Sequence, residues 1–572
     1  MRTSFSKIAA IVGIIFIAYL GFAQSGNNAV KIQAPLFGDL SSYSHPISTQ
    51  VPLAQRFFNQ GLVLFYGFEW NESIRSFRES ARLDPNCAMC YWGIALALGS
   101  KINAPRSGYE YQEAKTAIEK ALSLKDKTTP IEKAYIEGLA LRFQHKPQKV
   151  VAKTSVFSCH ISSASFDTSS KEEILNYAHA MKAIAKQYPS ENDAKALYTF
   201  GIFDVIKWNF WDPNGVINKL TPTIIQTLQT ILKSDPYHAG ANHYYVHVME
   251  SSKTPEKALE NADRLKTLVP GSEHLIHMPG HIYFRTGRYH DCSLSNMEAI
   301  KTFNKYNKTC RDQGFEPEIN YLYLHNFDFL RTTAVMEGRK HLAFSAVHKM
   351  LQSPFPEWLA QQPALQWFIP MPYYMETRFG EWDAVLKEPK PDEKYVYAIG
   401  MWRYARGLAF LHNQKIKNAE RESQELHKIV QAGPTNQNLQ KDGIELLKIA
   451  NNVLKAGLAD QAGDGELMIK YIQTDVKVQL YMGYHEQPDW YFPVKEVLAG
   501  AYLKWGKAKE AKAMYEEDLQ DYPKNGWALY GLAKSLRALG ENRKAAAVDQ
   551  AFKEAWRYAD IPAPVSLLPE KK

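Results

Sequence analysis

The sequence has 572 residues, of which 45% are hydrophobic and 12% are aromatic. This is enough apolar material for a large core or for several domains. The formal net charge is +8 without a long run of one sign, so we expect no nucleic-acid partner. Five cysteines are too few for a fold that disulfides hold together.

The first 23 residues are typical of a secretory signal. Arg2 and Lys7 give a basic start, residues 8–22 form an apolar run, and Gly21 and Ala23 supply small residues at the cleavage positions. The apolar run falls short of the roughly 20 residues that span a bilayer, so we expect cleavage after Ala23, with an uncleaved anchor as the alternative. No other stretch is long and apolar enough to cross a membrane. The protein is therefore expected to be exported, to the periplasm or beyond.

Small residues, aromatic residues and prolines recur at fixed offsets. Gly61 is followed by Phe77 at +16 and by Pro85 at +24, and Ala499 is followed by Tyr515 and Pro523 at the same offsets. These positions resemble the tetratricopeptide repeat, a pair of antiparallel helices in about 34 residues. The resemblance covers most of residues 51–560 and implies an all-α fold, an α-solenoid of helix pairs that forms a curved superhelix.

The chain also resembles a group of bacterial exported tetratricopeptide-repeat proteins, which implies an architecture but no reaction. The phrases that carry this resemblance are CAMCYWGIALALG, HYYVHVMESS, HLIHMPGHIYFRTGRY, YLHNFDFLRTTAVMEGR and HEQPDWYFPV. The predicted organisation is a signal peptide (1–23), a linker (24–50), an N-terminal block (51–145), a loop (146–170), a central block (171–431), a loop (432–442), a C-terminal block (443–560) and a polar tail (561–572).

Six of the 17 histidines lie within the 44 residues from 238 to 281. Histidines three or four residues apart share one face of a helix, although Pro279 must kink that segment or start a new helix. The intervening segment is predicted to be a helix that runs back, so the two histidine-bearing helices are neighbours. The candidate metal ligands are His243, His247, His274, His277, His281 and His325, with His238 as the weakest member of the group and with Glu250, Tyr244, Tyr245, Tyr283 and Asn326 nearby.

Imidazole nitrogens suit zinc or copper and do not suit calcium or magnesium. A metalloprotein, perhaps an enzyme, is therefore one hypothesis, with these histidines on the concave surface of the solenoid. In the alternative they are packing residues, and the protein is an exported scaffold that binds a protein, a peptide or a small ligand in its concave groove. Solenoids of this kind usually bind and seldom catalyse, which favours the scaffold. Generic enzyme signatures such as G-x-S-x-G and H-E-x-x-H are also missing.

Two further motifs leave alternatives open. In HEQPDWYF, the residues His485, Glu486, Trp490 and Tyr491 either close over a ligand or cap the last repeats. Cys87 and Cys90 lie where a helix should begin, which allows redox chemistry, a local disulfide or a buried pair of small residues. The isolated histidines, such as His45 and His412, belong to no such group.

Overall fold

A computed structural model describes residues 31–103, 108–144, 171–318, 322–361, 363–433, 441–564 and 566–569. Within these residues, the structure is helical apart from one isolated bridge between Trp211 and Ile217. This confirms the predicted all-α class. No helix among them is long and apolar enough to cross a membrane. The predicted signal peptide and the predicted loop 146–170 lie outside the described residues.

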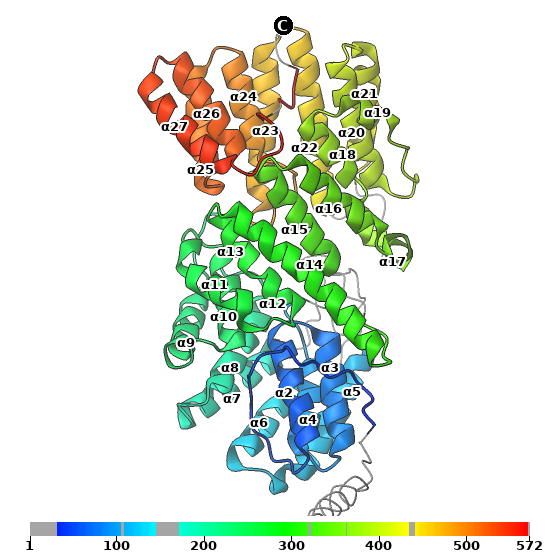
Figure 1. Cartoon of the computed structure of the whole chain (residues 1–572), viewed down its shortest axis with the longest axis vertical. Helices are drawn as coiled ribbons and strands as arrows, with labels where there is room; N and C mark the ends of the chain where they lie inside the picture. The colour runs from blue at the N-terminus through cyan, green and yellow to red at the C-terminus, as the bar shows by residue number, and fades with distance from the viewer. Residues whose placement is uncertain are drawn as a thin grey trace, which may run out of the picture.

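Helices follow one another as antiparallel neighbours along an elongated molecule (Figure 1). The N-terminal helices are α2 (Pro52–Tyr66), α3 (Trp70–Leu83), α4 (Ala88–Ala97), α5 (Gly108–Leu124), α6 (Pro130–Ala140), α7 (Lys171–Gln187), α8 (Asn192–Ile206) and α9 (Thr221–Ser234). The central helices are α10 (Ala239–Glu250), α11 (Leu259–Leu268), α12 (Glu273–His277), α13 (Pro279–Arg285), α14 (Tyr289–Asp312) and α15 (Leu322–Met336).

The remaining helices form the other end of the molecule (Figure 1). They are α16 (Lys340–Gln352), α17 (Phe355–Gln361), α18 (Met371–Phe379), α19 (Trp382–Lys387), α20 (Val396–His412), α21 (Ile416–Ala432), α22 (Lys441–Gln461), α23 (Gly465–Met482), α24 (Val494–Lys504), α25 (Ala508–Asp521), α26 (Gly526–Ala538) and α27 (Asn542–Ala555).

The fixed offsets seen in the sequence correspond to close contacts between helices. A Cβ atom added to Gly61 would lie 2.8 Å from the ring of Phe77, and one added to Gly93 would lie 2.2 Å from it. At the other end of the chain, a Cβ atom on Gly531 would lie 2.1 Å from the ring of Tyr515. The glycines are therefore required because an aromatic ring of the neighbouring helix occupies the space of a side chain.

Residues 31–50, the described part of the predicted linker, form no helix but pack along the N-terminal helices. The side chain of Gln60 accepts a hydrogen bond from the backbone of Phe37 at 2.9 Å, and the Tyr43 hydroxyl donates to Asp193 at 2.7 Å. This segment therefore connects α2 to α8, which lies more than 100 residues further along the chain.

Two predicted boundaries differ from the structure. Ala432 ends α21, and Lys441 and Asp442 belong to α22, so the predicted loop 432–442 is too long at both ends. A polar tail would stay in solvent, but Leu567 and Leu568 are buried against the C-terminal helices. Hydrophobic burial of two leucines outweighs the polar character of the rest of that segment.

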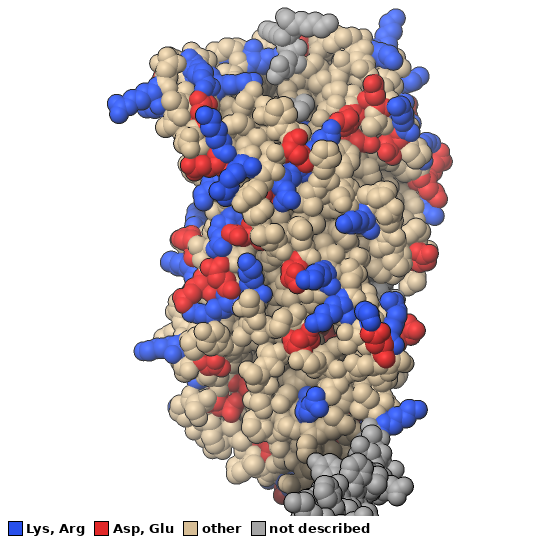
Figure 2. All heavy atoms as spheres, viewed as in Figure 1, with Lys and Arg blue, Asp and Glu red and all other residues tan. Residues whose placement is uncertain are grey.

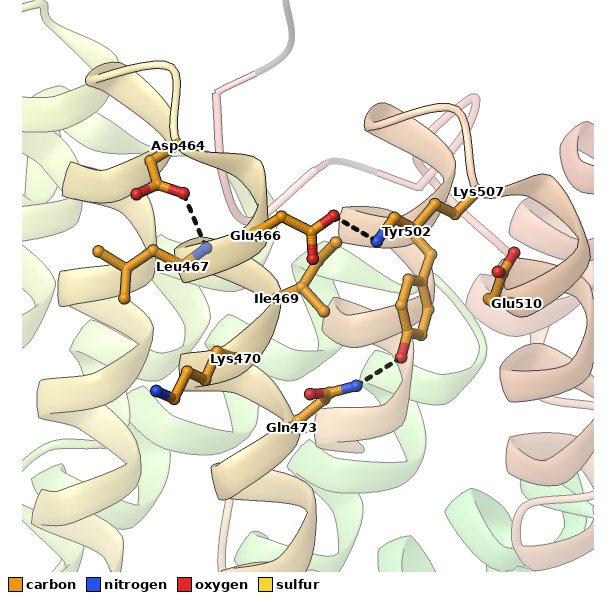
Figure 3. Close-up of a pocket in the computed structure, with 9 residues that line it drawn as sticks. All are labelled: Asp464, Glu466, Leu467, Ile469, Lys470, Gln473, Tyr502, Lys507 and Glu510. Carbon is orange, nitrogen blue, oxygen red and sulfur yellow. Dashed lines mark hydrogen bonds and ion pairs between the residues drawn. The ribbon is translucent and has the colours of Figure 1, made fainter.

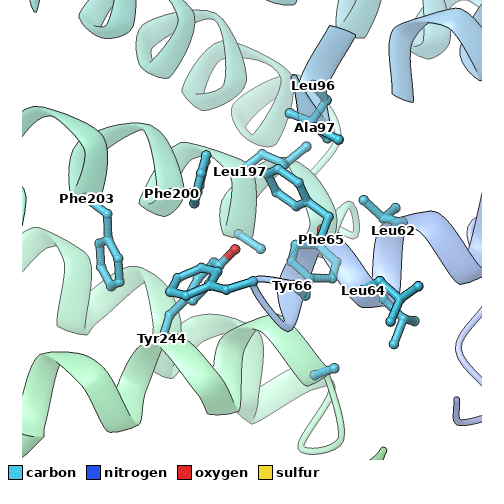
Figure 4. Close-up of a cluster of buried hydrophobic side chains, with 14 of the residues drawn as sticks. Leu62, Leu64, Phe65, Tyr66, Leu96, Ala97, Leu197, Phe200, Phe203 and Tyr244 are labelled. Carbon is cyan, nitrogen blue, oxygen red and sulfur yellow. The ribbon is translucent and has the colours of Figure 1, made fainter. Parts of the chain in front are cut away.

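The apolar core of the N-terminal half lies directly beside the histidine-rich helices. Figure 4 shows Phe65 and Tyr66 of α2 facing Phe200 of α8 and Tyr244 of α10. These aromatic side chains are all buried. They fix α10 against α2 and α8, which sets the position of the histidines on α10.

Cys87 and Cys90 form a disulfide at the start of α4. The sequence left three alternatives open for these cysteines, namely redox chemistry, a local disulfide and a buried pair of small residues. The structure shows the local disulfide. Cys292 and Cys310 are buried free cysteines.

Candidate metal centre

Four helices, α10, α12, α13 and α15, carry the six candidate histidines. His243 and His247 lie on α10, His274 and His277 on α12, His281 on α13, and His325 on α15. Pro279 begins α13, as expected from its effect on helices. The ligand nitrogens form two clusters, each with its atoms within 4.8 Å of one another: His243, His247 and His274 in one, and His277, His281 and His325 in the other.

This arrangement corrects one sequence-based expectation. The sequence predicted one group of metal ligands on neighbouring helices, but α10 supplies only the first cluster, and α13 and α15 only the second. His274 and His277, three residues apart on α12, divide between the two clusters. The two clusters remain neighbours, since the rings of His247 and His281 have centroids 5.8 Å apart.

The six histidines are also not on an open concave surface. Each has a relative exposure of 0–1%. The segment between α23 and α24 covers one side of the centre, because Glu486 contacts His325 at 3.2 Å and the hydroxyl of Tyr484 donates to Glu250 at 3.0 Å. The ring of Phe68 packs on His243, His247 and His274 of the first cluster. The expectation of surface-facing histidines is therefore wrong, because segments far away in the sequence pack on them.

In the first cluster, the Nδ1 atoms are held by acceptors. Nδ1 of His243 donates to the backbone oxygen of Tyr66 at 2.5 Å, and Nδ1 of His247 donates to Glu250 Oε1 at 2.7 Å. Nε2 of His243 then carries a lone pair, and it lies 3.2 Å from Nε2 of His274. Ordered Nδ1 partners with Nε2 atoms turned toward one another are typical of histidines that ligate metals.

In the second cluster, His277 and His281 have the same construction, whereas Nε2 of His325 contacts Glu486. Nδ1 of His277 donates to Asn296 Oδ1 at 2.8 Å, and the amide of Asn296 is oriented by its own hydrogen bond to Cys292. Nδ1 of His281 donates to the second carboxylate oxygen of Glu250. The Nε2 atoms of His277 and His281 lie 2.8 Å apart. Since both Nδ1 atoms carry hydrogen, two lone pairs would face each other unless a proton or a metal ion lies between them.

Glu250 connects the two clusters. One carboxylate oxygen contacts His247 and the other contacts His281, and the side chain is fully buried. It supplies a negative charge between two groups of nitrogen ligands. A carboxylate in this position would offset part of the charge of bound cations.

Burial keeps three of these six rings neutral. It lowers the pKa of His243, His274 and His277 well below the usual value, and neighbouring histidines lower it further. Burial acts in the same direction on His281, but the carboxylate of Glu250 outweighs it, so the pKa of His281 is raised. Three neutral rings have lone pairs for a metal, and the raised pKa of His281 favours a proton on that ring in the absence of one.

The other predicted residues divide between the centre and its surroundings. Glu486 contacts His325, and the ring centroid of Tyr244 lies 5.6 Å from that of His243. Tyr283 instead donates to Asp263, and Asn326 donates to Glu273. The other predicted residues of the segment between α23 and α24 lie apart from the two histidine clusters. His485 forms an ion pair with Asp489 at 2.9 Å, and Trp490 and Tyr491 are buried in the C-terminal core.

Sequence reasoning missed a second polar cluster around Asp193. Its carboxylate accepts hydrogen bonds from His45 at 2.7 Å, Tyr66 at 2.5 Å and Tyr43 at 2.7 Å, and it lies 3.3 Å from His238. His45 was expected to belong to no group, and His238 was grouped with the metal ligands. No spacing in the sequence indicates this cluster, since His45 and Asp193 are 148 residues apart.

A cavity of about 630 Å³ adjoins the histidine centre. Three of its lining residues each contact one member of the centre: Trp208 packs on His247 with ring centroids 5.1 Å apart, Tyr484 contacts Glu250, and Glu486 contacts His325. A small molecule bound in the cavity would therefore be separated from the buried clusters by a single side chain.

The exposed groove in Figure 3 is a weaker candidate. It lies between α23 and the helices α24 and α25, with a volume of about 580 Å³. Its polar groups satisfy one another, since Lys507 pairs with Glu466 at 2.6 Å and Gln473 donates to Tyr502 at 2.8 Å. On the face shown in Figure 2, cationic and anionic side chains are mixed over the surface.

No family model and no curated protein matches the chain. Among solved structures, the chain is similar to human IFIT1 in a dimer with m7Gppp-AAAA, at 10% identity over 90% of this chain and 92% of that chain, with a TM-score of 0.30. It is also similar to a chain of the APC/C hetero-tetramer Cut9-Hcn1, at 13% identity over 84% and 76%, with a TM-score of 0.28. Its own helix pairs place the chain in the class of helical-repeat proteins.

Proposed function

We propose that the protein is a helical-repeat binding protein with a transition-metal centre in its interior. The metal is zinc or copper, because all six ligands offered are imidazole nitrogens. The observation that carries the proposal is the pair of neighbouring three-histidine clusters, buried and joined by Glu250. Burying the Nε2 atoms of His277 and His281 2.8 Å apart is costly unless a proton or a metal ion lies between them.

The arrangement supports two metal ions rather than one. Each cluster offers three nitrogens, which leaves an open position on a four-coordinate ion. The carboxylate of Glu250 would orient one histidine of each cluster through its Nδ1 atom, and its negative charge would offset part of the charge of both ions. His277 and His281 would exchange the proton between them for a metal ion.

The adjoining cavity supports a binding role for this centre. Its volume of about 630 Å³ is within the range of small-molecule sites. Tyr484 lies between the cavity and Glu250, so a ligand in the cavity would contact the hydroxyl that donates to the carboxylate. The proposed ligand of the repeat protein is therefore a small molecule bound next to the metal centre.

Metal analysis of protein purified without a histidine tag tests the proposal. We expect up to two equivalents of zinc or copper per chain, either as purified or after incubation with the metal and removal of the excess. The variant His247→Ala/His281→Ala removes one nitrogen from each cluster and should lose most of this metal, whereas the exposed His348→Ala should retain it. Wild-type protein that takes up neither metal would contradict the proposal.

Changes to buried histidines also affect folding, so the thermal unfolding of wild-type protein gives a second readout. A metal that binds only the folded chain raises the unfolding temperature in proportion to the logarithm of its free concentration. We expect this rise for wild-type protein and for His348→Ala, and no rise for the double variant. A similar rise in all three would place the metal elsewhere.

We also propose that the chain is exported and that its first 23 residues are removed. The disulfide between Cys87 and Cys90 supports this, because disulfides persist in oxidising compartments. N-terminal sequencing of protein from the native host tests it, with Gln24 expected as the first residue. Protein that begins at Met1 and fractionates with the cytosol would contradict export.

A further inference from the structure

The chain turns back on itself after its last helix. The carboxylate of Asp560 accepts hydrogen bonds from the backbone nitrogens of Lys340 at 2.6 Å and His341 at 2.9 Å, at the start of α16. The indole of Trp556 donates to the backbone oxygen of Ile561 at 3.0 Å. These contacts direct the following residues back over the C-terminal helices, as the red trace in Figure 1 shows.

The residues that follow lie in a groove, here called the tail groove, formed by His412 of α20, Gly457 of α22, Lys504 of α24 and Trp527 of α26. Leu567 and Leu568 have relative exposures of 8% and 5% there. A Cβ atom on Gly457 would lie 3.2 Å from Leu568, so the missing side chain makes room for that leucine.

The tail groove also holds the main chain of this segment. Nε2 of His412 donates to the backbone oxygen of Leu567 at 3.0 Å, and Nζ of Lys504 donates to the backbone oxygen of Pro569. Lys504 is oriented by an ion pair with Asp460 at 2.6 Å, and the ring of His412 stacks on Trp382. Backbone oxygens are available on any extended peptide, so these two donors do not depend on the segment being part of this chain.

The groove is larger than the segment that occupies it. A cavity of about 350 Å³ remains beside the segment. Pro564, Leu567 and Leu568 line one side of this cavity. Residues of α24 and α26, together with Tyr515 of α25, line the other side. The aromatic ring of Trp527 lies among its walls. A peptide with longer side chains than the tail would therefore find additional apolar surface.

We propose that the tail groove is a peptide-binding groove that residues 566–569 occupy as a ligand in cis. Its partner in trans is an extended peptide with two adjacent leucines followed by a proline, the chemistry of the segment itself. A partner enters only when the tail leaves, so the tail keeps the groove closed. The groove shares no residue with the histidine centre, and the inference is independent of metal binding.

The experiment uses a fluorescent peptide of residues 564–572, PVSLLPEKK, and a chain that ends at Ala563. We expect the shortened chain to bind the peptide in fluorescence anisotropy. The full chain should bind it at least about tenfold more weakly, because its own tail competes at a high effective concentration. A peptide with glutamate in place of both leucines should not bind either chain.

A full-length variant separates displacement of the tail from loss of folding. Leu567→Asp/Leu568→Asp should release the tail and bind the wild-type peptide as the shortened chain does, whereas Leu467→Asp, at an exposed leucine of α23, should behave as the full chain. Equal binding of the peptide by the full and shortened chains would overturn the proposal. The proposal would also fail if neither the shortened chain nor the Leu567→Asp/Leu568→Asp variant binds the peptide while circular dichroism shows intact helices. Dimers formed by exchange of tails would also overturn the cis arrangement.

Discussion

Glu250 lies three residues after His247 on α10, and its carboxylate accepts a hydrogen bond from Nδ1 of that ring at 2.7 Å. Neighbours at this spacing share one face of a helix, so the local sequence is sufficient to form this contact. The other oxygen of the same carboxylate contacts His281, 31 residues further along the chain. The side chain of Glu250 thus contacts His247 on its own helix and His281 on α13. Only the packing of α13 on α10 brings His281 close.

The variant Glu250→Gln tests the role of this carboxylate. An amide offers only one acceptor, so Nδ1 of either His247 or His281 loses its partner. We expect the affinity for zinc to fall by about 10–100-fold, the usual effect of removing a group that orients a metal ligand. Competition with a fluorescent chelator measures this, and the exposed Glu256→Gln serves as the control.

Unchanged zinc affinity in Glu250→Gln would show that the carboxylate is structural. The helix content of the variant, measured by circular dichroism, decides whether a loss of affinity is specific, since an unfolded chain would lose metal for any substitution.

Metal retention should extend to more acidic pH than free imidazole allows. Protons compete with the metal for the lone pairs, and the pKa values of His243, His274 and His277 are lowered well below the usual value of about 6.5. Because a lower pKa means weaker competition from protons, we expect half of the metal to remain bound at a pH below 6.5. Dialysis of loaded protein against buffers from pH 8 to pH 4 measures the midpoint, and a midpoint above pH 6.5 would contradict the burial of these rings.

Asp193 should stabilise the fold at neutral pH. Burial alone would raise the pKa of this carboxyl, but hydrogen bonds from His238 and His45 outweigh burial and hold the pKa well below its usual range. The stabilisation is therefore present above the unfolded pKa of about 3.9 and is lost as the pH falls through the lower folded value. Asp193→Asn leaves the two histidines and the hydroxyls of Tyr43 and Tyr66 around a neutral group.

We expect Asp193→Asn to destabilise the protein by about 3 kcal/mol at pH 7, as for removal of one member of a buried ion pair. Urea unfolding followed by circular dichroism measures this. The control is Asp549→Asn, which removes an exposed partner of Arg537 and should change the stability by less than about 0.5 kcal/mol. Equal stability of both variants would show that the Asp193 cluster contributes little.

Asp475 is expected to have the opposite effect. Burial raises its pKa to about 8, although the amide of Asn452 donates to it at 2.7 Å. In the unfolded chain this carboxyl ionises near pH 3.9, so keeping it neutral in the fold costs increasing free energy between about pH 4 and pH 8.

The substitution Asp475→Asn removes this cost. We expect the variant to be more stable than wild type by at least about 1 kcal/mol at pH 8 and nearly equal to it at pH 4. Thermal unfolding at the two pH values measures the difference. A gain of the same size at both pH values would have to come from packing rather than from ionisation.

Short-range features of this protein could be predicted from the sequence because helices place residues at fixed spacings. The offset between Gly61 and Phe77 predicted a close approach of two helices, and the structure has that contact. His243 and His247 share one face of α10, as their four-residue spacing indicates, and Pro279 starts a new helix between His277 and His281.

The sequence by itself determined the helical class, the pairing of neighbouring helices and the richness of the central repeats in nitrogen ligands. Only the tertiary structure decided that His274 and His277 belong to different clusters, that Glu486 contacts His325, and that the histidines are buried. These contacts depend on the cumulative rotation of successive helix pairs, which brings the segment after α23 onto α10 and α15. No local spacing encodes that rotation, because it is the sum of many packing contacts between side chains.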